Sequence, residues 1–232
     1  MSILVLCPSR GRPEKARELR ESFDDTTTSG YADLLFITDE DDETRKEYPD
    51  LKTTIPRGRP GMVDALNEVA MRAVKVGRRY KYLGFVGDDH RFRTRGWDMA
   101  IFDNMERRGG GFAYGNDLLQ GENLPTAVFV STEIVRELGY FSPPKLAHLY
   151  VDDSWKYLGD GADCLYYFPD IIIEHMHPFN GKAEWDEGYR RVNDTGVISA
   201  DRFAYEEWLR VDADKDVARV KEALRQLQAD VL

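Results

Sequence analysis

Residues 82–90 read Tyr-Leu-Gly-Phe-Val-Gly-Asp-Asp-His, an apolar run that ends in two carboxylates and an imidazole. A short apolar run of this kind is typical of a strand that is buried on both faces of a sheet. In open α/β sheets, ligands bind at the carboxyl ends of such strands. Asp88, Asp89 and His90 therefore predict a metal site at a sheet edge, since carboxylates and imidazoles bind divalent ions. The two aspartates could instead cap the element that follows the strand.

Apolar segments alternate with helical patterns along most of the chain. Besides residues 82–86, strands are predicted at residues 3–7, 34–38, 112–114, 127–130, 164–168 and 171–174. Helices are predicted at residues 13–23, 61–76, 97–107, 132–138 and 149–158, the second of them closed by Gly77. This order predicts an α/β fold with a mixed, mostly parallel sheet flanked by helices.

The chain has 232 residues, a length that suits one large domain with an appendage. We expect the domain to occupy residues 1–180. Residues 181–232 are expected to form a polar, mobile segment and then a C-terminal helix that packs on the same domain. Apolar residues at positions 217, 220, 224, 227 and 231 predict this helix, because their spacing is that of an amphipathic helix.

The composition narrows the class of partner. The formal net charge is −10, which does not favour non-specific binding to nucleic acid or to anionic membranes. A basic run, Arg91, Arg93 and Arg95, lies beside the acidic pair and could contact a phosphate backbone or simply face solvent. No apolar run reaches the length of a membrane span. Cys7 and Cys164 form no disulfide framework and are expected to be reduced core residues of a cytoplasmic protein.

A second segment carries metal-ligand side chains after an apolar run. Glu174, His175 and His177 follow three isoleucines, and three of the four histidines of the chain lie here and at His90. One carboxylate with two imidazoles suits Mn²⁺, Fe²⁺ or Zn²⁺. We predict that Asp88 and His90, two residues apart on a strand end, bind a metal ion together with His175 or His177. The alternative is a pair of surface histidines that follow a strand.

Another acidic pair, Asp152 and Asp153, begins a predicted helix. One carboxylate could cap the helix while the other acts as a general base, with its pKa raised by the charge of its neighbour. The alternative is that the pair only caps the helix.

The loops after the first two predicted strands are also polar. Ser9, Arg10 and Arg12 precede a helix, whose amino terminus favours a bound phosphate, although the loop has neither GxGxxG spacing nor a P-loop. Asp39 and Asp41 directly follow the second strand. They could accept hydrogen bonds from a nucleobase or a ribose, or they could belong to a solvated acidic loop.

In this order, the segments resemble the glycosyltransferases of the GT-A (Rossmann-like) fold, in particular the large family 2 group, over residues 1–180. Asp39 matches the acidic residue after the second strand that commonly contacts uracil in these enzymes. The loop after the first strand is similar to the one that receives the nucleotide. That likeness implies donor contacts from Pro8, Ser9, Arg10 and Arg12.

Three later segments extend the resemblance. The Asp-Asp-His motif at residues 88–90 resembles the DxD motif in its DxH form, which binds metal and donor diphosphate. The acidic pair at residues 152–153 matches a pair, usually Glu-Asp, whose second member is the base in inverting enzymes, so the likeness implies that role for Asp153. A late histidine, here His175 or His177, also completes the metal shell in GT-A enzymes.

The resemblance implies a metal-dependent enzyme that moves a sugar from a nucleotide-diphosphate sugar, most often a UDP-sugar, to an acceptor hydroxyl. The implied cofactor is Mn²⁺ or Mg²⁺. Inversion at the anomeric carbon is favoured, and retention stays open because the DxH form also occurs in retaining members. Lys182 lies in the expected mobile segment, and we expect it to close over the diphosphate.

The acceptor is less constrained. The fragments Gly-Asp-Asp-His-Arg and His-Met-His-Pro are similar to hypothetical glycosyltransferases encoded by bacteriophages of actinobacteria. This likeness implies a hydroxymethylated base in phage DNA or a virion protein as the acceptor in the host cytoplasm, and another protein or a glycan also stays open as the acceptor. Two other functions stay open: a metal-dependent phosphohydrolase with the same residues, and a non-catalytic nucleotide- or glycan-binding module.

Overall fold

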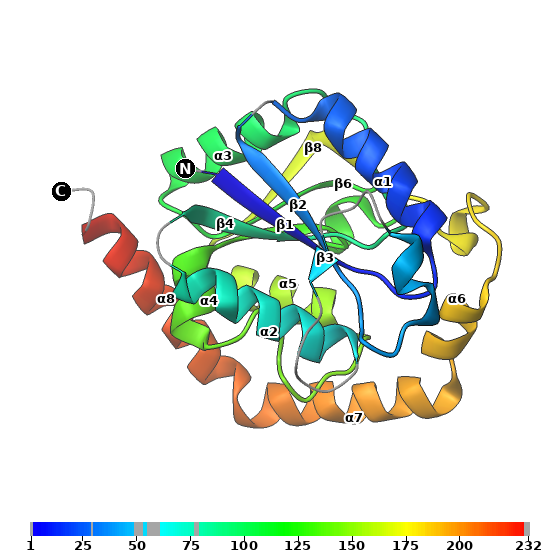
Figure 1. Ribbon diagram of the computed structural model, residues 1–232. Helices are drawn as coiled ribbons and strands as arrows, with labels where there is room; N and C mark the ends of the chain where they lie inside the picture. Colours follow the sequence, from blue (N-terminus) through cyan, green and yellow to red (C-terminus); the bar gives the residue numbers. More distant parts are fainter. Residues whose placement is uncertain (1, 29, 49–52, 55–60, 77–78, 230–232) are drawn as a thin grey trace.

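The computed structural model describes residues 2–28, 30–48, 53–54, 61–76 and 79–229. Within these residues, eight strands form one sheet in the order β3-β2-β1-β4-β7-β6-β8-β5 (Figure 1). The strands are β1 (Ser2–Pro8), β2 (Ala32–Ile37), β3 (Thr53–Thr54), β4 (Tyr80–Phe85), β5 (His90–Phe92), β6 (Phe112–Asn116), β7 (Val128–Ser131) and β8 (Leu165–His175). Only β7 and β5 run against the other strands, so the predicted mixed, mostly parallel sheet is confirmed.

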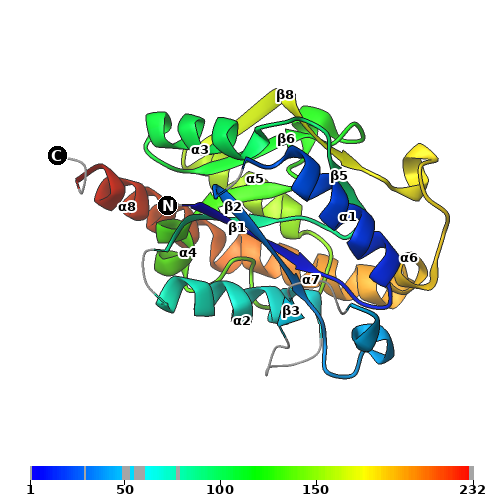
Figure 2. The same ribbon diagram turned by 45° about the horizontal axis from the view of Figure 1, so that its top comes forward.

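Helices cover both faces of the sheet. On one face lie α1 (Pro13–Thr26) and α3 (Trp97–Arg108), and on the other lie α2 (Met62–Lys75), α4 (Thr132–Leu138), α5 (Val151–Gly161) and α8 (Ala213–Ala229) (Figures 1 and 2). After β8 come α6 (Glu187–Val192) and α7 (Thr195–Val211), and α7 runs along the lower rim of the molecule in Figure 1. Short 3₁₀ helices are η1 (Glu43–Glu47), η2 (Gly121–Asn123) and η3 (Pro178–Asn180).

The alternation of side chains along β1 accounts for the two helical layers. Ile3, Val5 and Cys7 belong to the apolar core beneath α1 and α3. Leu4 and Leu6 point the other way, into the core shared with α2, α4, α5 and α8. Because successive strand residues face opposite sides, a strand that is apolar throughout needs helices on both faces. Both cysteines of the chain are buried and unpaired, as the sequence predicted.

The structure corrects one prediction about the strands. The two strands expected around Pro169 form a single strand, β8. Among the described residues, β5 pairs only with residues 173–175 of β8, so Pro169 lies where β8 has no partner on that side. Proline has no N–H to donate, and a free strand edge with a shift in register tolerates it.

Helices α6 and α7 occupy a part of the chain for which the sequence predicted no helix. Asp186 and Asp194 cap them, because each carboxylate accepts a backbone N–H of the first turn. The expected helix cap Gly77 lies outside the described residues, and the division of the chain at residue 180 stays a prediction. Among the described helices, none combines the length and the apolar character that a bilayer crossing demands.

The topology brings several polar loops to one edge of the sheet. β1, β2 and β4 are parallel neighbours, so the loops at their carboxyl ends lie together. β8 runs in the same direction through its pairing with β6, and it ends at His175. β5 is antiparallel to β8 and therefore begins at the same edge, with His90 opposite His175.

Candidate active site

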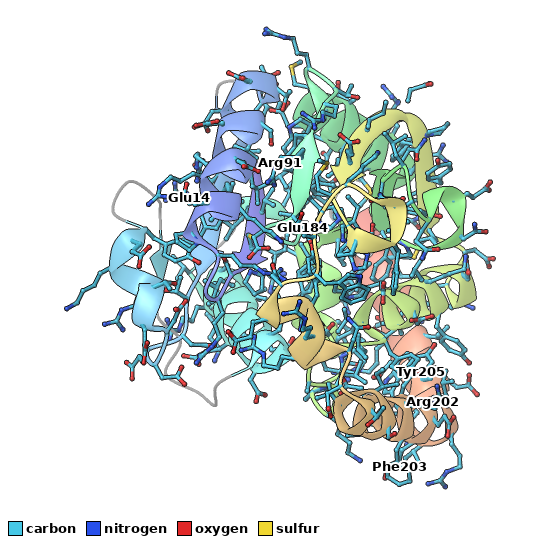
Figure 3. The ribbon with its side chains drawn as sticks, turned by 90° about the vertical axis from the view of Figure 1, so that its right-hand side faces the viewer. Glu14, Arg91, Glu184, Arg202, Phe203 and Tyr205 are labelled. Carbon is cyan, nitrogen blue, oxygen red and sulfur yellow. The ribbon has the colours of Figure 1, made fainter. Side chains whose placement is uncertain are left out.

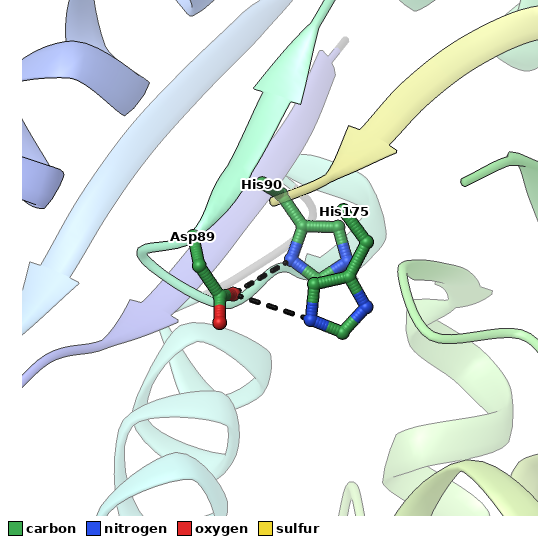
Figure 4. A group of neighbouring side chains, drawn as sticks. All are labelled: Asp89, His90 and His175. Atoms are coloured by element: carbon green, nitrogen blue, oxygen red, sulfur yellow. Dashed lines mark ion pairs between the residues drawn. The ribbon is translucent and has the colours of Figure 1, made fainter. Parts of the chain in front are cut away.

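His90 and His175 are the centre of the candidate site. The two residues are direct partners in the β5–β8 ladder, and their rings stack with centroids 4.3 Å apart. Asp89 Oδ1 lies 3.4 Å from His90 Nδ1 and 3.5 Å from His175 Nε2 (Figure 4). The two segments that the sequence predicted at one metal site, residues 88–90 and 175–177, thus lie side by side.

The structure differs from the prediction in the aspartate that faces the histidines. Asp88, the predicted metal ligand, points instead to the first loop, where it accepts hydrogen bonds from Ser9 Oγ at 2.8 Å and Arg12 Nη1 at 3.2 Å. The prediction extended the alternation of a strand through residue 90. However, β4 ends at Phe85 and the chain then turns, with His90 N–H donating to Gly87 O. This turn presents Asp89, not Asp88, to the two imidazoles.

Opposite charges meet in this cluster. Burial alone would raise the pKa of Asp89, but its pairing with His175 and His90 outweighs burial and holds that pKa well below its usual range. Burial also disfavours the charged form of His175, yet Asp117 and Asp89 together raise its pKa to about 9. Burial and the charge of His175 lower the pKa of His90. The charges of Asp89 and Asp117 thus favour a cation at this position, either a proton on His175 or a metal ion in its place.

The cluster fits a divalent metal ion. One ligand atom each from Asp89, His90 and His175 lies within 4.8 Å of the others. His90 Nε2 is buried without a hydrogen-bond partner, which is uncommon for a histidine with a purely structural role. His175 Nδ1 also makes no hydrogen bond, but it lies 3.9 Å from Asp117 Oδ2. His177, the other predicted ligand, lies 5.0 Å from His175 between ring centroids, and its Nδ1 accepts the N–H of Phe179. A carboxylate and two imidazoles suit Mn²⁺, Fe²⁺ or Zn²⁺.

Asp117 lies behind His175 and is not among the residues predicted for the site. Its Oδ2 is 3.9 Å from His175 Nδ1. Its Oδ1 accepts three backbone N–H groups, from residues 119–121, and its Oδ2 accepts the hydroxyl of Thr126. Carboxylates in this position commonly orient metal-binding histidines. The signal was present, because Asp117 comes just after a strand, as Asp88 does.

A cavity of about 630 Å³ opens beside the cluster. It is lined by most of the predicted site residues, namely Pro8, Ser9, Arg10, Arg12, Asp39, Asp88, Asp89, His90, Asp152, His175 and His177. Two predicted residues are not part of the lining. Lys182, expected over a diphosphate, has its ammonium 2.5 Å from Glu174 Oε1 instead. Asp153, the expected base, is half-buried on α5 outside the lining.

The acidic pair at the start of α5 is therefore split by the structure. Asp152 lines the cavity, and burial together with the charge of Asp153 raises its pKa to about 6. A carboxyl with that pKa is largely ionised at neutral pH and is still basic enough to accept a proton. The helix geometry explains the choice, because adjacent residues on a helix do not face the same side.

The first loop is held by charge pairs. Arg10 Nη1 lies 3.1 Å from Asp39 Oδ2 and 2.5 Å from Asp41 Oδ1. Tyr48, which follows η1, places its hydroxyl 3.0 Å from Ser9 Oγ, and that hydroxyl accepts the N–H of Arg12. Both acidic residues predicted after the second strand thus lie at the cavity with the arginine predicted to contact the donor.

Tyr189 of α6 lines this wall of the cavity and Asp186 caps the same helix, and neither residue was predicted from the sequence. The Tyr189 hydroxyl donates to Asp89 Oδ2 at 2.7 Å. The Asp186 carboxylate accepts hydrogen bonds from Arg12 at 2.6 Å and from Lys15 at 2.8 Å. The guanidinium of Arg12 also lies 4.2 Å from the centroid of the Tyr189 ring. No pattern marks these residues in the sequence, because the segment lacks apolar periodicity.

A buried aspartate of α7 fixes the loop that leads into α5. Asp201 is 2% exposed and accepts the backbone N–H groups of residues 147–149 at 2.7–2.9 Å. This loop carries His148 into the cavity lining and is followed by Asp152. Burial lowers the pKa of His148 to about 4, so its ring is neutral at pH 7.

Neither a protein-family model nor a curated protein matches the chain. Solved structures do match it. Mannosyltransferase PcManGT from Pyrobaculum calidifontis, in complex with GDP-Man and Mn²⁺, has a TM-score of 0.56 at 12% identity, over 98% of this chain and 75% of that one. S. aureus TarS 1–349 in complex with UDP has a TM-score of 0.55 at 13% identity, over 97% and 92%. Glucosyl-3-phosphoglycerate synthase from Mycobacterium tuberculosis, with Mn²⁺, UDP and phosphoglyceric acid, has a TM-score of 0.55 at 13% identity, over 88% and 78%.

At these identities, the matches establish the fold. The chain has the GT-A (Rossmann-like) fold with C-terminal helices, as the sequence predicted. Its structural neighbours are glycosyltransferases that use nucleotide-diphosphate sugars.

Proposed function

We propose that this protein transfers a sugar from a nucleotide-diphosphate sugar to an acceptor hydroxyl with the help of a divalent metal ion. The observation that carries the proposal is the meeting of Asp89, His90 and His175 at the edge of a cavity of about 630 Å³. The GT-A fold supports it, because neighbours with this fold were solved with UDP or GDP-Man and, in two cases, Mn²⁺. A UDP-sugar is the proposed donor, since Asp39 lines the cavity after β2.

The proposed metal ligands are Asp89, His90 and His175, with His177 close by. A Mn²⁺ or Mg²⁺ ion held by these residues would supply positive charge to balance the negative charge of the donor diphosphate. Asp117 positions the ring of His175 from behind. These assignments replace the ligand Asp88 of the sequence motif with its neighbour Asp89.

The first loop is the proposed phosphate-binding wall. Arg12 and Lys15 lie at the start of α1, where the helix amino terminus also favours an anion. Ser9 and Arg12 also donate hydrogen bonds to Asp88, which hold that carboxylate in place. Asp39, together with Arg10, lies at the part of the cavity proposed for the nucleobase and ribose.

Asp152 is the proposed general base. Its carboxylate accepts the proton of the acceptor hydroxyl while that oxygen forms a bond to the anomeric carbon. The bond between the anomeric carbon and the diphosphate oxygen breaks, and the electron pair leaves with the nucleoside diphosphate. A single displacement of this kind inverts the anomeric carbon. The acceptors proposed from the sequence are a hydroxymethylated DNA base, a protein or a glycan.

Nucleotide binding tests the proposal directly. Thermal unfolding is measured with UDP, UDP-glucose, UDP-GlcNAc and GDP-mannose, each with and without Mn²⁺. Ligand at a hundredfold excess over its Kd adds about 2.7 kcal/mol to the free energy of unfolding, which raises Tm measurably. We expect such a rise with at least one UDP compound when Mn²⁺ is present, and its loss in His175→Ala. The proposal fails if no nucleotide binds, or if the protein releases phosphate from simple phosphoesters and transfers no sugar.

A further inference from the structure

We propose that Phe179 and Trp185 form a stacking platform for a carbohydrate acceptor at the mouth of the cavity. The inference rests on the proposed sugar transfer and narrows its acceptor from three classes to one. Phe179 is 70% exposed and Trp185 is 41% exposed, and their ring centroids lie 5.4 Å apart. Large apolar side chains exposed together at a cavity mouth are typical of a binding surface.

The platform is continuous with the candidate metal cluster. The ring of His177 lies 4.7 Å from Phe179 and 5.0 Å from Tyr189, between centroids. Tyr189 in turn donates its hydroxyl to Asp89 and lies 6.1 Å from Trp185. His177, Phe179 and Tyr189 all line the cavity. An acceptor that stacks on the outer rings therefore extends inward towards the reacting groups.

The backbone holds Phe179 firmly although its ring packs little within the fold. It belongs to η3, where His177 and Asn180 form a reciprocal cap. The Asn180 amide also donates to the carbonyl of His175 at 2.8 Å, which ties η3 to the end of β8. Gly181 closes the turn with φ 73°, a conformation that suits glycine. An aromatic side chain has few rotatable bonds, so one on a fixed backbone loses little conformational freedom when it binds a partner.

Charge favours a neutral sugar over a nucleic acid. Between residues 181 and 191, the chain has three acidic side chains, Glu184, Asp186 and Glu187, and three basic ones, Lys182, Arg190 and Arg191, so the segment has no excess of positive charge. Lys182 is paired with Glu174, and Asp186 is paired with Arg12 and Lys15. Figure 3 shows Glu184 on the segment between η3 and α6. Single-stranded nucleic acid needs a positively charged groove beside the aromatic rings, whereas sugar hydroxyls donate readily to carboxylates.

Tryptophan fluorescence can report on the platform without a transfer assay. The chain has four tryptophans, and Trp97, Trp155 and Trp208 are at most 5% exposed, so a ligand at the mouth changes mainly the emission of Trp185. The protein, with and without UDP and Mn²⁺, is titrated with maltotetraose, chitotetraose and mannotetraose, and with a twelve-residue oligothymidylate as the competing class. We expect a saturable change with at least one oligosaccharide and none with the oligonucleotide.

Two alanine variants make the test specific. Phe179→Ala is expected to weaken oligosaccharide binding by about tenfold, which corresponds to one stacking contact. Phe203→Ala is the matched control, because Phe203 is also 70% exposed but lies on α7, well away from Glu184 in Figure 3. Equal effects of the two variants, or a response to the oligonucleotide alone, would overturn the platform. So would the absence of any response to sugars in a protein that binds UDP. Failure to bind UDP counts against the proposed transfer, and the titrations without UDP still test the platform.

Discussion

Two pairs of adjacent aspartates lie at this cavity, and the structure uses different members of each. After β4, the second aspartate, Asp89, faces the histidines while Asp88 turns to Ser9 and Arg12. At the start of α5, the first aspartate, Asp152, lines the cavity while Asp153 lies outside the lining. The difference follows from the backbone. In the first pair, a turn makes the two side chains point in different directions. In the second pair, the helix does so, because adjacent helical residues face different sides.

The two pairs also differ in electrostatics. Burial and the charge of Asp89 raise the pKa of Asp88 to about 6, whereas its two histidine partners hold the pKa of Asp89 well below its usual range. In the α5 pair the shift goes one way, because burial raises the pKa of both Asp152 and Asp153. Asp89 is thus arranged to keep a negative charge for a cation, and Asp152 to take up a proton.

The largest expected effect is on catalysis, and it comes from a substitution in the α5 pair. Asp152→Asn should lower kcat of sugar transfer by about 10²–10⁴-fold, the contribution typical of a general base, with little change in Mn²⁺-dependent UDP affinity. Asp153→Asn is the matched control and should keep most of the activity. For the unaltered protein, kcat/KM should rise with pH and level off above about pH 6, because Asp152 must be ionised. A large loss in Asp153→Asn alone would return the base to the residue that the sequence motif implied.

The next largest expected effect is on nucleotide binding, and it distinguishes Asp89 from Asp88 in the β4 pair. Asp89→Asn should weaken Mn²⁺-dependent UDP binding by at least about 100-fold, because it removes the only carboxylate in the histidine cluster of the described residues. Asp88→Asn should weaken it by about tenfold or less, since that side chain acts through Ser9 and Arg12. Isothermal titration with UDP, with and without Mn²⁺, measures both. Equal losses would mean that the two aspartates share the metal, and circular dichroism of each variant checks that it folds.

The stability of the protein should also depend on the α5 pair. The pKa of Asp152 is about 6 in the folded chain, against 3.8 for an ordinary aspartate, so the folded state binds a proton more tightly than the unfolded state. The stability that this proton provides is full below about pH 4 and is lost as the pH rises to about 6. Asp152→Asn should therefore raise the free energy of unfolding by up to about 3 kcal/mol at pH 7.5, since each pKa unit corresponds to about 1.4 kcal/mol, and have a much smaller effect at pH 4. Urea unfolding at both pH values measures the change, and an equal effect at the two would contradict it.

The sequence predicted much of the site because strand ends and helix starts are visible in it. Residues 8–12, 39, 88–90 and 152 each follow an apolar strand or begin a helix, and the sheet brings them to one cavity. The sequence could not predict which aspartate of each pair faces the site, since that depends on the geometry of one turn and one helix start. Asp117 was missed although it carries the same signal as Asp88, a carboxylate close behind a strand.

The contribution of α6 could not be predicted by the same reasoning. Residues 181–194 have no apolar periodicity, so nothing in the sequence marks them as structured or as part of the cavity. Their position depends on long-range pairs, from Asp186 to Arg12 and Lys15 and from Tyr189 to Asp89. Such pairs join positions more than 90 residues apart, and only the fold brings them together.

The smallest expected effect concerns Asp186, which joins the first loop and the start of α1 to the segment after residue 180. Its carboxylate forms ion pairs with Arg12 and Lys15. These are the two cations that we propose to bind the donor diphosphate. Asp186→Asn should release them and tighten UDP binding by about two- to fivefold, as expected for a partly exposed ion pair. Asp194→Asn is the matched control, because Asp194 also caps a helix in this segment but is hydrogen-bonded to Gly196. If Asp186→Asn instead weakened UDP binding, the carboxylate would be positioning Arg12 for the donor. The segment after residue 180 would then belong to the donor site as fully as the first loop does.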